Sequence, residues 1–326
     1  MKVVILSCLA TVVFMTAVFI IGTGYFIGNY MVHFGLERGT PENPQEPPRA
    51  YALLMPPESR HYNRPDFLSE EWSLRSEDGL HLVATHFSPE EQSDRWVIVA
   101  HGYGCNQNNS YYIAANYLMR GWHVLTPDLR ASGASEGRFL TLGCYESEDI
   151  SQWAREIATR YPRAHIILHG VSMGAATVML AVDDADLPAQ VVACVEDCGY
   201  TSAYELLAGQ MEESFGLPSF PAMNLLDWRC EKVAGFSLHE AVPAVAVQHS
   251  RVPLLFIHGT SDTLVPPRMA RELYAKANAP RKELLLIEGA IHAAASQKEQ
   301  ERYFQTISAF VEPYVGQAKP KANVRS

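Results

Sequence analysis

Short apolar segments alternate with amphipathic ones from about residue 70 onward, and this alternation limits the fold more than any other feature of the sequence. Runs such as Trp96–Ala100, His165–Leu168 and Leu254–Ile257 have the length and continuity of strands that are buried on both faces. The stretch Glu146–Arg160 between two such runs is predicted to be helical and ends at Tyr161-Pro162. Strands that alternate with helices indicate a mostly parallel sheet with helices on both faces.

We expect eight strands in this sheet. The first two, Glu71–Arg75 and Leu80–Phe87, alternate apolar and polar residues around Asp78-Gly79, which predicts an antiparallel hairpin. The other expected strands are Trp96–Ala100, His123–Thr126, His165–Leu168, Val191–Val195, Leu254–Ile257 and Glu283–Ile287, and the expected helices are Asn108–Arg120, Glu146–Arg160, Met173–Val182 and Ala295–Val311. Residues 200–250 interrupt the alternation and predict a short helical lid. Its apolar residues either line a pocket or pack the lid helices together: Phe215, Leu217, Phe220, Met223, Leu225 and Leu226.

The N-terminal segment Val3–Gly28 contains no charged residue, and a helix of that length can cross a hydrocarbon core about 30 Å thick. A secretory signal has a shorter apolar region and a small-residue cleavage site, so we expect a retained, single-pass anchor in the cell membrane. Lys2 is the only charge before this run, which places the rest of the chain outside the cytoplasm. Gly24 and Gly28 form a GxxxG step that would let helices pack closely, although glycine is common in such segments.

Prolines are frequent between residues 37 and 70, and they predict an extended stalk. The formal net charge of -10 repels phosphate backbones, so we expect no nucleic-acid partner. The six cysteines form neither a CxxC pair nor a zinc-ligand spacing. Cys105 and Cys144 are both expected on loops at one end of the sheet, which makes a disulfide between them a hypothesis.

Ser172 lies in the pentapeptide Gly-Val-Ser-Met-Gly at residues 170–174, between an expected buried strand and an expected helix. In that context G-x-S-x-G predicts a nucleophile elbow, which lifts the serine to the sheet edge at a helix N-terminus. Side chains at the glycine positions would clash with the neighbouring strand and helix. The alternative is a glycine-rich turn with an ordinary N-cap serine.

A serine hydroxyl needs a base before it can act as a nucleophile. Asp262 follows the strand Leu254–Ile257 and His292 follows the last expected strand, so the chain order is Ser172, Asp262, His292. This is the order of a Ser-acid-His triad in which Asp262 orients His292. His258 also lies at a strand end but precedes the acid, and it is the alternative base.

Residues 101–104, His-Gly-Tyr-Gly, follow another buried strand and are predicted to be an oxyanion loop. One backbone donor is expected after the nucleophile and one in this loop, so we assign the N–H groups of Met173 and Tyr103. Asp128 and Arg130 are expected to pair and brace the following loop. No Walker-A loop, HExxH helix or dinucleotide-type glycine motif appears outside the N-terminal apolar run, so we expect neither a cofactor nor a metal.

Six motifs lie at the expected strand ends. They are His101-Gly102-Tyr103, Asp128-x-Arg130-x-x-Gly133-x-Ser135-x-Gly137, Gly170-x-Ser172-Met173-Gly174, Glu196-Asp197-Cys198-Gly199-Tyr200-Thr201-Ser202, His258-Gly259-x-x-Asp262-x-x-Val265-Pro266 and Gly289-x-x-His292. With these motifs the chain resembles the α/β-hydrolase superfamily along residues 70–315, and it is most similar to BEM46-like proteins. The resemblance implies an esterase, thioesterase or related acyl hydrolase that needs no metal. Many relatives carry Arg-Gly-His where this chain has Arg130-Ala131-Ser132, a difference at the pocket rim that leaves the triad untouched.

We therefore expect an anchor over residues 1–30, a stalk over 31–69, an α/β-hydrolase domain over 70–318 and a tail over 319–326. The expected function is a membrane-anchored serine hydrolase that cleaves a small or lipid-like acyl ester or thioester. One alternative is a serine peptidase or aminopeptidase, in which Glu212 or Glu213 of the lid would hold the substrate ammonium. The other is a non-catalytic binding module with a relic site. The sequence predicts no oligomeric state.

Overall fold

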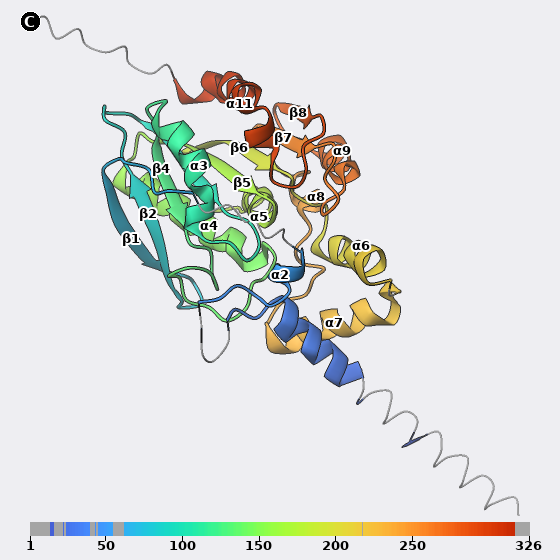
Figure 1. The fold of residues 1–326 in the computed structure, drawn as a ribbon. Coiled ribbons are helices and arrows are strands. Elements are labelled where there is room, and N and C mark those ends of the chain that lie inside the picture. The colour runs from blue at the N-terminus through green and yellow to red at the C-terminus, as the bar shows by residue number, and fades with distance from the viewer. Residues whose placement is uncertain are drawn as a thin grey trace, which may run out of the picture.

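The computed structural model describes residues 14–15, 22, 24–39, 43, 45–54, 62–216 and 218–316. Eight strands in this part of the chain form one sheet in the order β1-β2-β4-β3-β5-β6-β7-β8 (Figure 1). They are β1 (Ser69–Arg75), β2 (His81–Phe87), β3 (Arg95–Ala100), β4 (His123–Pro127), β5 (His165–Val171), β6 (Val191–Asp197), β7 (Leu254–Gly259) and β8 (Lys282–Ile287). Strand β2 is antiparallel to both neighbours, and the other adjacent pairs are parallel. The predicted mostly parallel eight-stranded sheet is confirmed.

The register of the central strands brings their carboxyl ends to the same level. Ala100 of β3 pairs with Gly170 of β5, Gly170 pairs with Glu196 of β6, and Glu196 pairs with Phe256 of β7. The loops after these strands therefore begin side by side at one sheet edge, where ligands bind in folds of this class.

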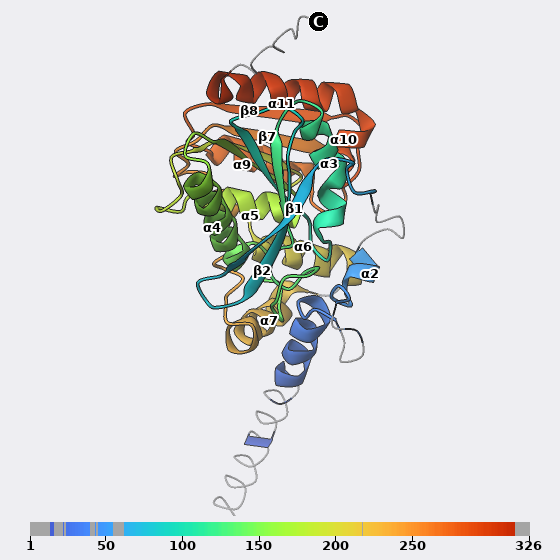
Figure 2. The same ribbon diagram turned by 90° about the vertical axis from the view of Figure 1, so that its left-hand side faces the viewer.

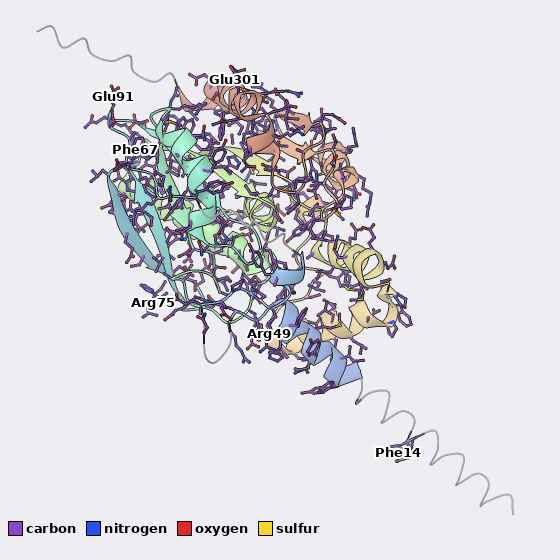
Figure 3. The ribbon with its side chains drawn as sticks, viewed as in Figure 1. Phe14, Arg49, Phe67, Arg75, Glu91 and Glu301 are labelled. Atoms are coloured by element: carbon purple, nitrogen blue, oxygen red, sulfur yellow. The ribbon has the colours of Figure 1, made fainter. Side chains whose placement is uncertain are left out.

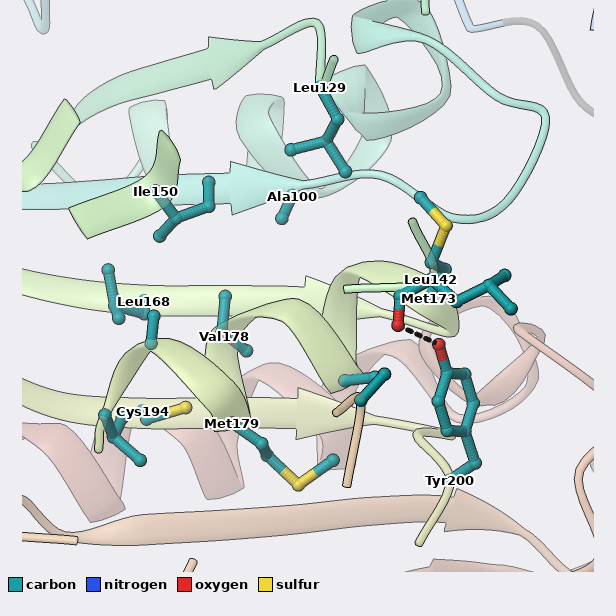
Figure 4. Packing of buried hydrophobic residues seen from close by; sticks show 14 of the residues in the cluster. Ala100, Leu129, Leu142, Ile150, Leu168, Met173, Val178, Met179, Cys194 and Tyr200 are labelled. Atoms are coloured by element: carbon teal, nitrogen blue, oxygen red, sulfur yellow. Dashed lines mark hydrogen bonds between the residues drawn. The ribbon is translucent and has the colours of Figure 1, made fainter. Parts of the chain in front are cut away.

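Apolar side chains alternate between the two faces along the buried strands, as strand geometry requires. In β3, Trp96 and Ile98 pack into one cluster, whereas Val97 and Val99 pack into the other. The first cluster includes α4 (Cys144–Arg160), α5 (Met173–Ala181) and α9 (Pro267–Lys276), and the second includes α3 (Gln107–Leu118) and α11 (Gln300–Val315). Figure 2 shows α4 and α3 on opposite sides of the sheet, and Figure 4 shows the first cluster from close by. The predicted helices on both faces are confirmed.

Three helices between β6 and β7 form the predicted lid. They are α6 (Ala203–Phe215), α7 (Ser219–Val233) and α8 (Pro243–Ala246). Helix α6 begins where the Ser202 side chain accepts a hydrogen bond from the backbone N–H of Glu205, and it ends at Gly216, whose φ of 62° suits glycine. These signals delimit a helical insertion above the carboxyl edge of the sheet.

The C-terminal helix differs from its predicted span Ala295–Val311. It is divided at Glu299, whose φ of -132° and ψ of 62° are not helical, into α10 (Ala295–Lys298) and α11. Helix α11 continues to Val315 because its buried side chains pack on the second cluster along its whole length. The predicted tail, 319–326, lies outside the described residues.

Residues 24–35 form a helix that lies beside α7 instead of standing away from the domain, and Figures 1 and 2 agree on this. Val32 on this helix is fully buried in the first cluster. Glu37 then forms a β-bridge with Phe139, and the Arg38 guanidinium donates to the carbonyl of Ser135. The structure thus differs from the expected stalk over residues 31–69. The prolines that suggested a stalk begin only at residue 41, whereas the residues before them carry an apolar surface that the domain covers.

The glycine step of this helix faces the lid. A Cβ atom at Gly24 would lie 3.0 Å from a Leu225 methyl carbon, and one at Gly28 would lie 2.8 Å from the Leu225 carbonyl oxygen. Gly24 and Gly28 therefore bring the helix close to α7 of the same chain. The short helix α2 (Tyr51–Leu54) follows, and the Tyr51 ring packs on Gly104.

Most of the apolar run Val3–Gly28 lies outside the described residues, so the membrane anchor stays a prediction. In the described part of the chain, no helix is both long enough and apolar enough to span a bilayer. Figure 3 labels Phe14 and Glu301, which lie at opposite ends of the molecule. The N-terminal helix therefore lies far from α11.

Candidate active site

Ser172 lies in the tight turn between β5 and α5, with a φ of 59° and a ψ of -118°. This is a strained conformation for a residue with a side chain. The turn closes because a Cβ atom at Gly170 would overlap the carbonyl oxygen of Gly174, and one at Gly174 would overlap that of Ala100. The N–H of Ser172 donates to the Asp197 carbonyl at 2.8 Å, which ties the turn to the next strand. The local geometry is that of the predicted elbow.

The three residues predicted to act together form one hydrogen-bonded chain. His292 Nε2 lies 2.8 Å from Ser172 Oγ, and His292 Nδ1 lies 2.7 Å from Asp262 Oδ2. The backbone N–H groups of Leu264 and Val265 each donate to Asp262 Oδ1 at 2.9 Å. Because an ionised Asp262 can only accept, Nδ1 carries a hydrogen and Nε2 is free to accept the serine proton.

Asp262 is buried, and burial alone would raise its pKa. Hydrogen bonds from His258 and His292 outweigh that effect and hold the pKa of Asp262 at about 2. The carboxylate therefore stays ionised across the neutral range. It can stabilise a positive charge on His292.

His258, the alternative base, contacts Asp262 from another side. Its Nε2 lies 2.8 Å from the Val265 carbonyl oxygen and 3.3 Å from Asp262 Oδ2. Burial lowers the pKa of His258, but the hydrogen bond to Asp262 opposes burial, and the pKa of His258 is raised. These contacts make His258 a support for the carboxylate and leave the hydroxyl of Ser172 to His292.

Two more carboxyl groups are buried behind the elbow. Glu196 accepts a hydrogen bond from the Gly199 N–H at 2.9 Å, and burial raises the pKa of Glu196 to about 8. Asp197 accepts one from the Tyr303 hydroxyl at 2.9 Å, and burial raises the pKa of Asp197 to about 6. Negative charge behind the site is therefore limited at neutral pH, since Glu196 keeps its proton.

The predicted oxyanion loop lies against the candidate nucleophile. A Cβ atom at Gly102 would be 3.3 Å from Ser172 Cβ, so glycine allows this approach. His101 fastens the loop, because its Nδ1 lies 2.9 Å from the Gly102 carbonyl oxygen and its Nε2 accepts the Leu129 N–H at 3.0 Å. Tyr103 and Met173 both line the cavity beside Ser172. Met173 is also the first residue of α5, where N–H groups lack intrahelical partners.

The loop after β4 is braced, but not by the predicted pair. Asp128 accepts hydrogen bonds from the N–H groups of Gln107 and Ala134, each at 2.8 Å. Arg130 donates to both carboxylate oxygens of Asp149 at 2.7 Å. The predicted Asp128–Arg130 pair is therefore wrong. Asp128 is paired at the start of α3 and Arg130 is paired on α4, so each side chain is satisfied by a different element.

An apolar cavity of about 360 Å³ opens beside Ser172. Its lining carries no acidic or basic side chain among the described residues. It consists of Ile27, Tyr30, Met31, Phe34, Gly35, Leu36, Ala50, Tyr103, Leu142, Ser172, Met173, Tyr200, Leu206, Leu207, Gln210, Met211, Leu226, Leu264 and Val265.

Of the lid residues predicted to be apolar lining or lid packing, Leu226 lines the cavity and Met223 is fully buried. Leu225 contacts the N-terminal helix, and Phe220 is exposed. The side chain of Phe215 and the whole of Leu217 lie outside the described residues. Sequence reasoning missed the N-terminal contribution to the cavity, although Ile27, Met31 and Phe34 have the i, i+4, i+7 spacing of one helix face.

The described residues offer one group of three potential metal ligands: Cys198, Asp262 and His292. Asp262 and His292 already take part in the hydrogen-bonded chain that ends at Ser172. Burial raises the pKa of the Cys198 thiol well above its usual range. Cys105 and Cys144 are free thiols, so the hypothetical disulfide between them is not formed. Cys105 instead lies 3.9 Å from the Tyr51 hydroxyl.

Comparison with known proteins agrees with this arrangement. The profile of the family described as "Hydrolase_4: Serine aminopeptidase, S33" matches residues 91–196 and 226–299, more than half of the chain, and spans Ser172, Asp262 and His292. The protein YqkD of Bacillus subtilis is 28% identical over 240 residues, which cover 72% of this chain and 76% of YqkD. YfhR of Escherichia coli (strain K12) is 24% identical over 260 residues, covering 78% and 84%.

Two solved structures show the same fold. The Pyrococcus furiosus esterase Pf2001 has a TM-score of 0.63 and 24% identity, over 77% of this chain and 94% of the esterase. The Pyrococcus horikoshii acylaminoacyl peptidase has a TM-score of 0.58 and 16% identity, over 80% of this chain and 44% of the peptidase. The narrower resemblance to BEM46-like proteins stays a prediction. The expected superfamily is confirmed: the chain belongs to this family of α/β-hydrolases, and it is a hydrolase.

Proposed function

We propose that this hydrolase cleaves acyl esters or thioesters through an acyl-enzyme on Ser172. The observation that carries the proposal is the unbroken hydrogen-bond chain from Asp262 through His292 to Ser172, at the edge of an uncharged cavity. His292 Nε2 takes the proton as Ser172 Oγ attacks the acyl carbonyl. The N–H groups of Met173 and Tyr103 hold the oxyanion.

The second half of the reaction uses the same groups in reverse order. His292 gives its proton to the departing alcohol or thiol, and the acyl group remains on Ser172. A water molecule then attacks the acyl carbonyl while His292 takes its proton. His292 returns that proton to Ser172 Oγ as the bond to the acyl carbon breaks, which releases the carboxylic acid and restores the hydroxyl. Ionised Asp262 keeps the imidazole in one tautomer throughout.

The cavity favours an ester over an aminoacyl substrate. An aminopeptidase needs a carboxylate that pairs with the substrate ammonium, because an unpaired charge in an apolar cavity is costly. Glu212 and Glu213, the predicted candidates, are exposed on α6 and are not among the residues that line the cavity. A relic binding module would also have no reason to retain the strained backbone of Ser172.

We propose further that the uncharged run Val3–Gly28 anchors the chain in the cell membrane through the residues before Gly24, with Lys2 inside and the hydrolase domain outside the cytoplasm. The absence of charge along this run supports the proposal. Protease added to intact cells should digest the hydrolase domain, and full protection of the domain would contradict the orientation.

The test is labelling of the full-length protein with a fluorophosphonate probe, followed by peptide mapping. Ser172 should be labelled, and Ser172→Ala should abolish both the labelling and the hydrolysis of p-nitrophenyl butyrate. Ser308→Ala is a matched control, since Ser308 lies on α11 and hydrogen-bonds only to the Phe304 carbonyl within its own helix. Folded protein that resists the probe would refute the proposal. Faster turnover of alanine p-nitroanilide than of the ester would favour the peptidase.

A further inference from the structure

We propose that the N-terminal helix, residues 24–35, is a wall of the acyl-binding site, and that the site takes one unbranched acyl chain of a membrane amphiphile. This inference rests on the proposed function and deepens it by naming the substrate class. It gives the N-terminal segment a role in selecting the substrate in addition to attachment.

The N-terminal segment supplies six of the nineteen residues that line the cavity, spread over its length from Ile27 to Leu36. The helices α6 and α7 supply the facing wall through residues such as Leu207, Met211 and Leu226. Without the N-terminal segment these lid residues would face solvent. The cavity therefore requires both the N-terminal segment and the lid.

Specific contacts hold the helix in this place. Asn29 accepts a hydrogen bond from the Arg229 guanidinium of α7 at 2.9 Å. The Tyr103 hydroxyl donates to the Gly35 carbonyl at 2.5 Å, which links the helix directly to the predicted oxyanion loop. The Leu140 N–H donates to the Leu36 carbonyl at 2.9 Å. The wall is therefore fixed at its middle and at its C-terminal end, and it is connected to the predicted oxyanion loop.

The size and chemistry of the cavity specify the acyl group. The cavity of about 360 Å³ is bounded by the lid and the N-terminal helix, so it accepts an acyl chain only up to the length that fills it. Because the lining carries no charge, an acyl chain with an ionised far end would lose its hydration without compensation.

The cavity reaches the surface at the N-terminal helix. Ile27 and Tyr30 line the cavity and are also 43% and 56% exposed, so they mark its mouth. Exposed aromatic residues also lie on this helix and on the adjacent α7, and we call them the aromatic patch: Tyr25, Phe26, Phe220 and Trp228. The rings of Tyr25 and Trp228 are 6.2 Å apart.

A bilayer is the occupant that fits this aromatic patch. Exposed aromatic residues gather where a protein meets the membrane interface, because their rings prefer the headgroup level. The uncharged run Val3–Gly28 leads directly into the same helix. A single-chain amphiphile would enter the cavity from the bilayer past Ile27. Its ester group would then lie near Ser172 and its tail along the apolar lining.

The first experiment measures kcat/KM of the full-length protein for p-nitrophenyl esters of four to sixteen carbons. Each buried methylene should raise kcat/KM about fourfold until the chain fills the cavity, and longer chains should bring no further rise. Met31→Trp should end this rise at least two carbons earlier, because the larger side chain occupies the tail path. Met119→Trp, the same change at the exposed residue that caps the C-terminus of α3 and does not line the cavity, should leave the profile unchanged.

Ile27→Trp is a second variant in case Met31→Trp does not fold, since position 27 is partly exposed and tolerates a larger ring. An unchanged profile in a folded variant of either kind overturns the wall. A wild-type profile that is flat while the fluorophosphonate probe still labels Ser172 overturns this inference and leaves the proposed function standing. Absence of labelling refutes the proposed function itself.

The second experiment tests the bilayer as the source. Phe26→Ser combined with Phe220→Ser should slow hydrolysis of a monoacylglycerol in phosphatidylcholine vesicles about tenfold, and leave a soluble six-carbon ester unaffected. Met119→Ser is the control. Equal turnover of the vesicle substrate by the double variant and wild type overturns delivery from the bilayer. A shift from dimer to monomer with unchanged turnover would instead identify the aromatic patch as a contact between copies.

Discussion

Replacing Asp262 with asparagine removes one charge and one acceptor from a carboxylate that four N–H groups address. Leu264 and Val265 donate to Oδ1 at 2.9 Å each, while His292 at 2.7 Å and His258 at 3.3 Å address Oδ2. An asparagine oxygen can serve only one of these two sides. The amide oxygen can therefore accept either from the two backbone N–H groups or from His292, but not from both sides.

The magnitudes decide the choice. Turning the amide NH2 toward Leu264 and Val265 would leave two backbone donors unpaired, at about 1–3 kcal/mol for the buried Val265 N–H and less for the part-buried Leu264 N–H. Turning it toward His292 costs less, because the imidazole can adopt the other tautomer and accept at Nδ1. Nε2 then carries a hydrogen and cannot take the proton of Ser172. We expect kcat to fall about 10⁴-fold in Asp262→Asn, or about 5 kcal/mol of activation free energy.

The assay is steady-state hydrolysis of p-nitrophenyl butyrate, together with the rate of fluorophosphonate labelling, since both steps need the same base. Asp183→Asn is the matched control, because Asp183 also lies 3.2 Å from a histidine Nδ1, that of His249, but at the surface. The double variant Asp262→Asn/His292→Ala should lose little more than His292→Ala alone, because residues that act as a unit are not additive. A single Asp262→Asn variant that retains more than about a tenth of wild-type kcat would refute the assigned tautomer.

Three further variants test the surroundings. His258→Gln should keep roughly a tenth or more of kcat, because His258 supports Asp262 without contacting Ser172; a loss as large as that of Asp262→Asn would make His258 the base. The free energy of unfolding of Glu196→Gln minus that of wild type should be larger at pH 8 than at about pH 5, by a few kcal/mol. Burial raises the folded-state pKa of Glu196 to about 8 from 4.5, so wild type loses stability as pH rises through that window, and urea unfolding at both pH values measures the difference. Arg130→Met should cost about 3–5 kcal/mol in urea unfolding, since it leaves the carboxylate of Asp149 buried and unpaired; a loss below about 1 kcal/mol would contradict this.

The position of the N-terminal helix changes how the chain divides into parts. The sequence suggested a cut near residue 70, with an independent hydrolase domain after it. A chain cut there would lose Val32 and Leu36 from the core, the Glu37 bridge to Phe139, and one wall of the cavity. We expect such a truncation to bind acyl chains poorly even where it folds. Work on the catalytic properties therefore requires the segment from residue 24 onward.

The local sequence was sufficient for the sheet and for the order of the reacting residues. Buried strands are recognised by continuous apolar runs. The tight turn at Ser172 is recognised by its glycines, because a Cβ atom at either position would overlap the backbone. Ser172, Asp262 and His292 each follow a parallel strand, and parallel strands end at the same sheet edge, so their positions in the sequence were enough to predict that they lie close together. These are properties of single segments and their sequence, which short-range physics determines.

Only the tertiary structure decided which partner each long-range group takes. Arg130 pairs with Asp149 rather than Asp128, His258 supports Asp262, and the helix from Gly24 onward closes the cavity against α7. A side chain or an amphipathic face can be satisfied by any complementary group within reach, and its sequence does not say which one arrives. The packing of whole elements makes that choice, because it fixes distances between residues that lie far apart in the chain.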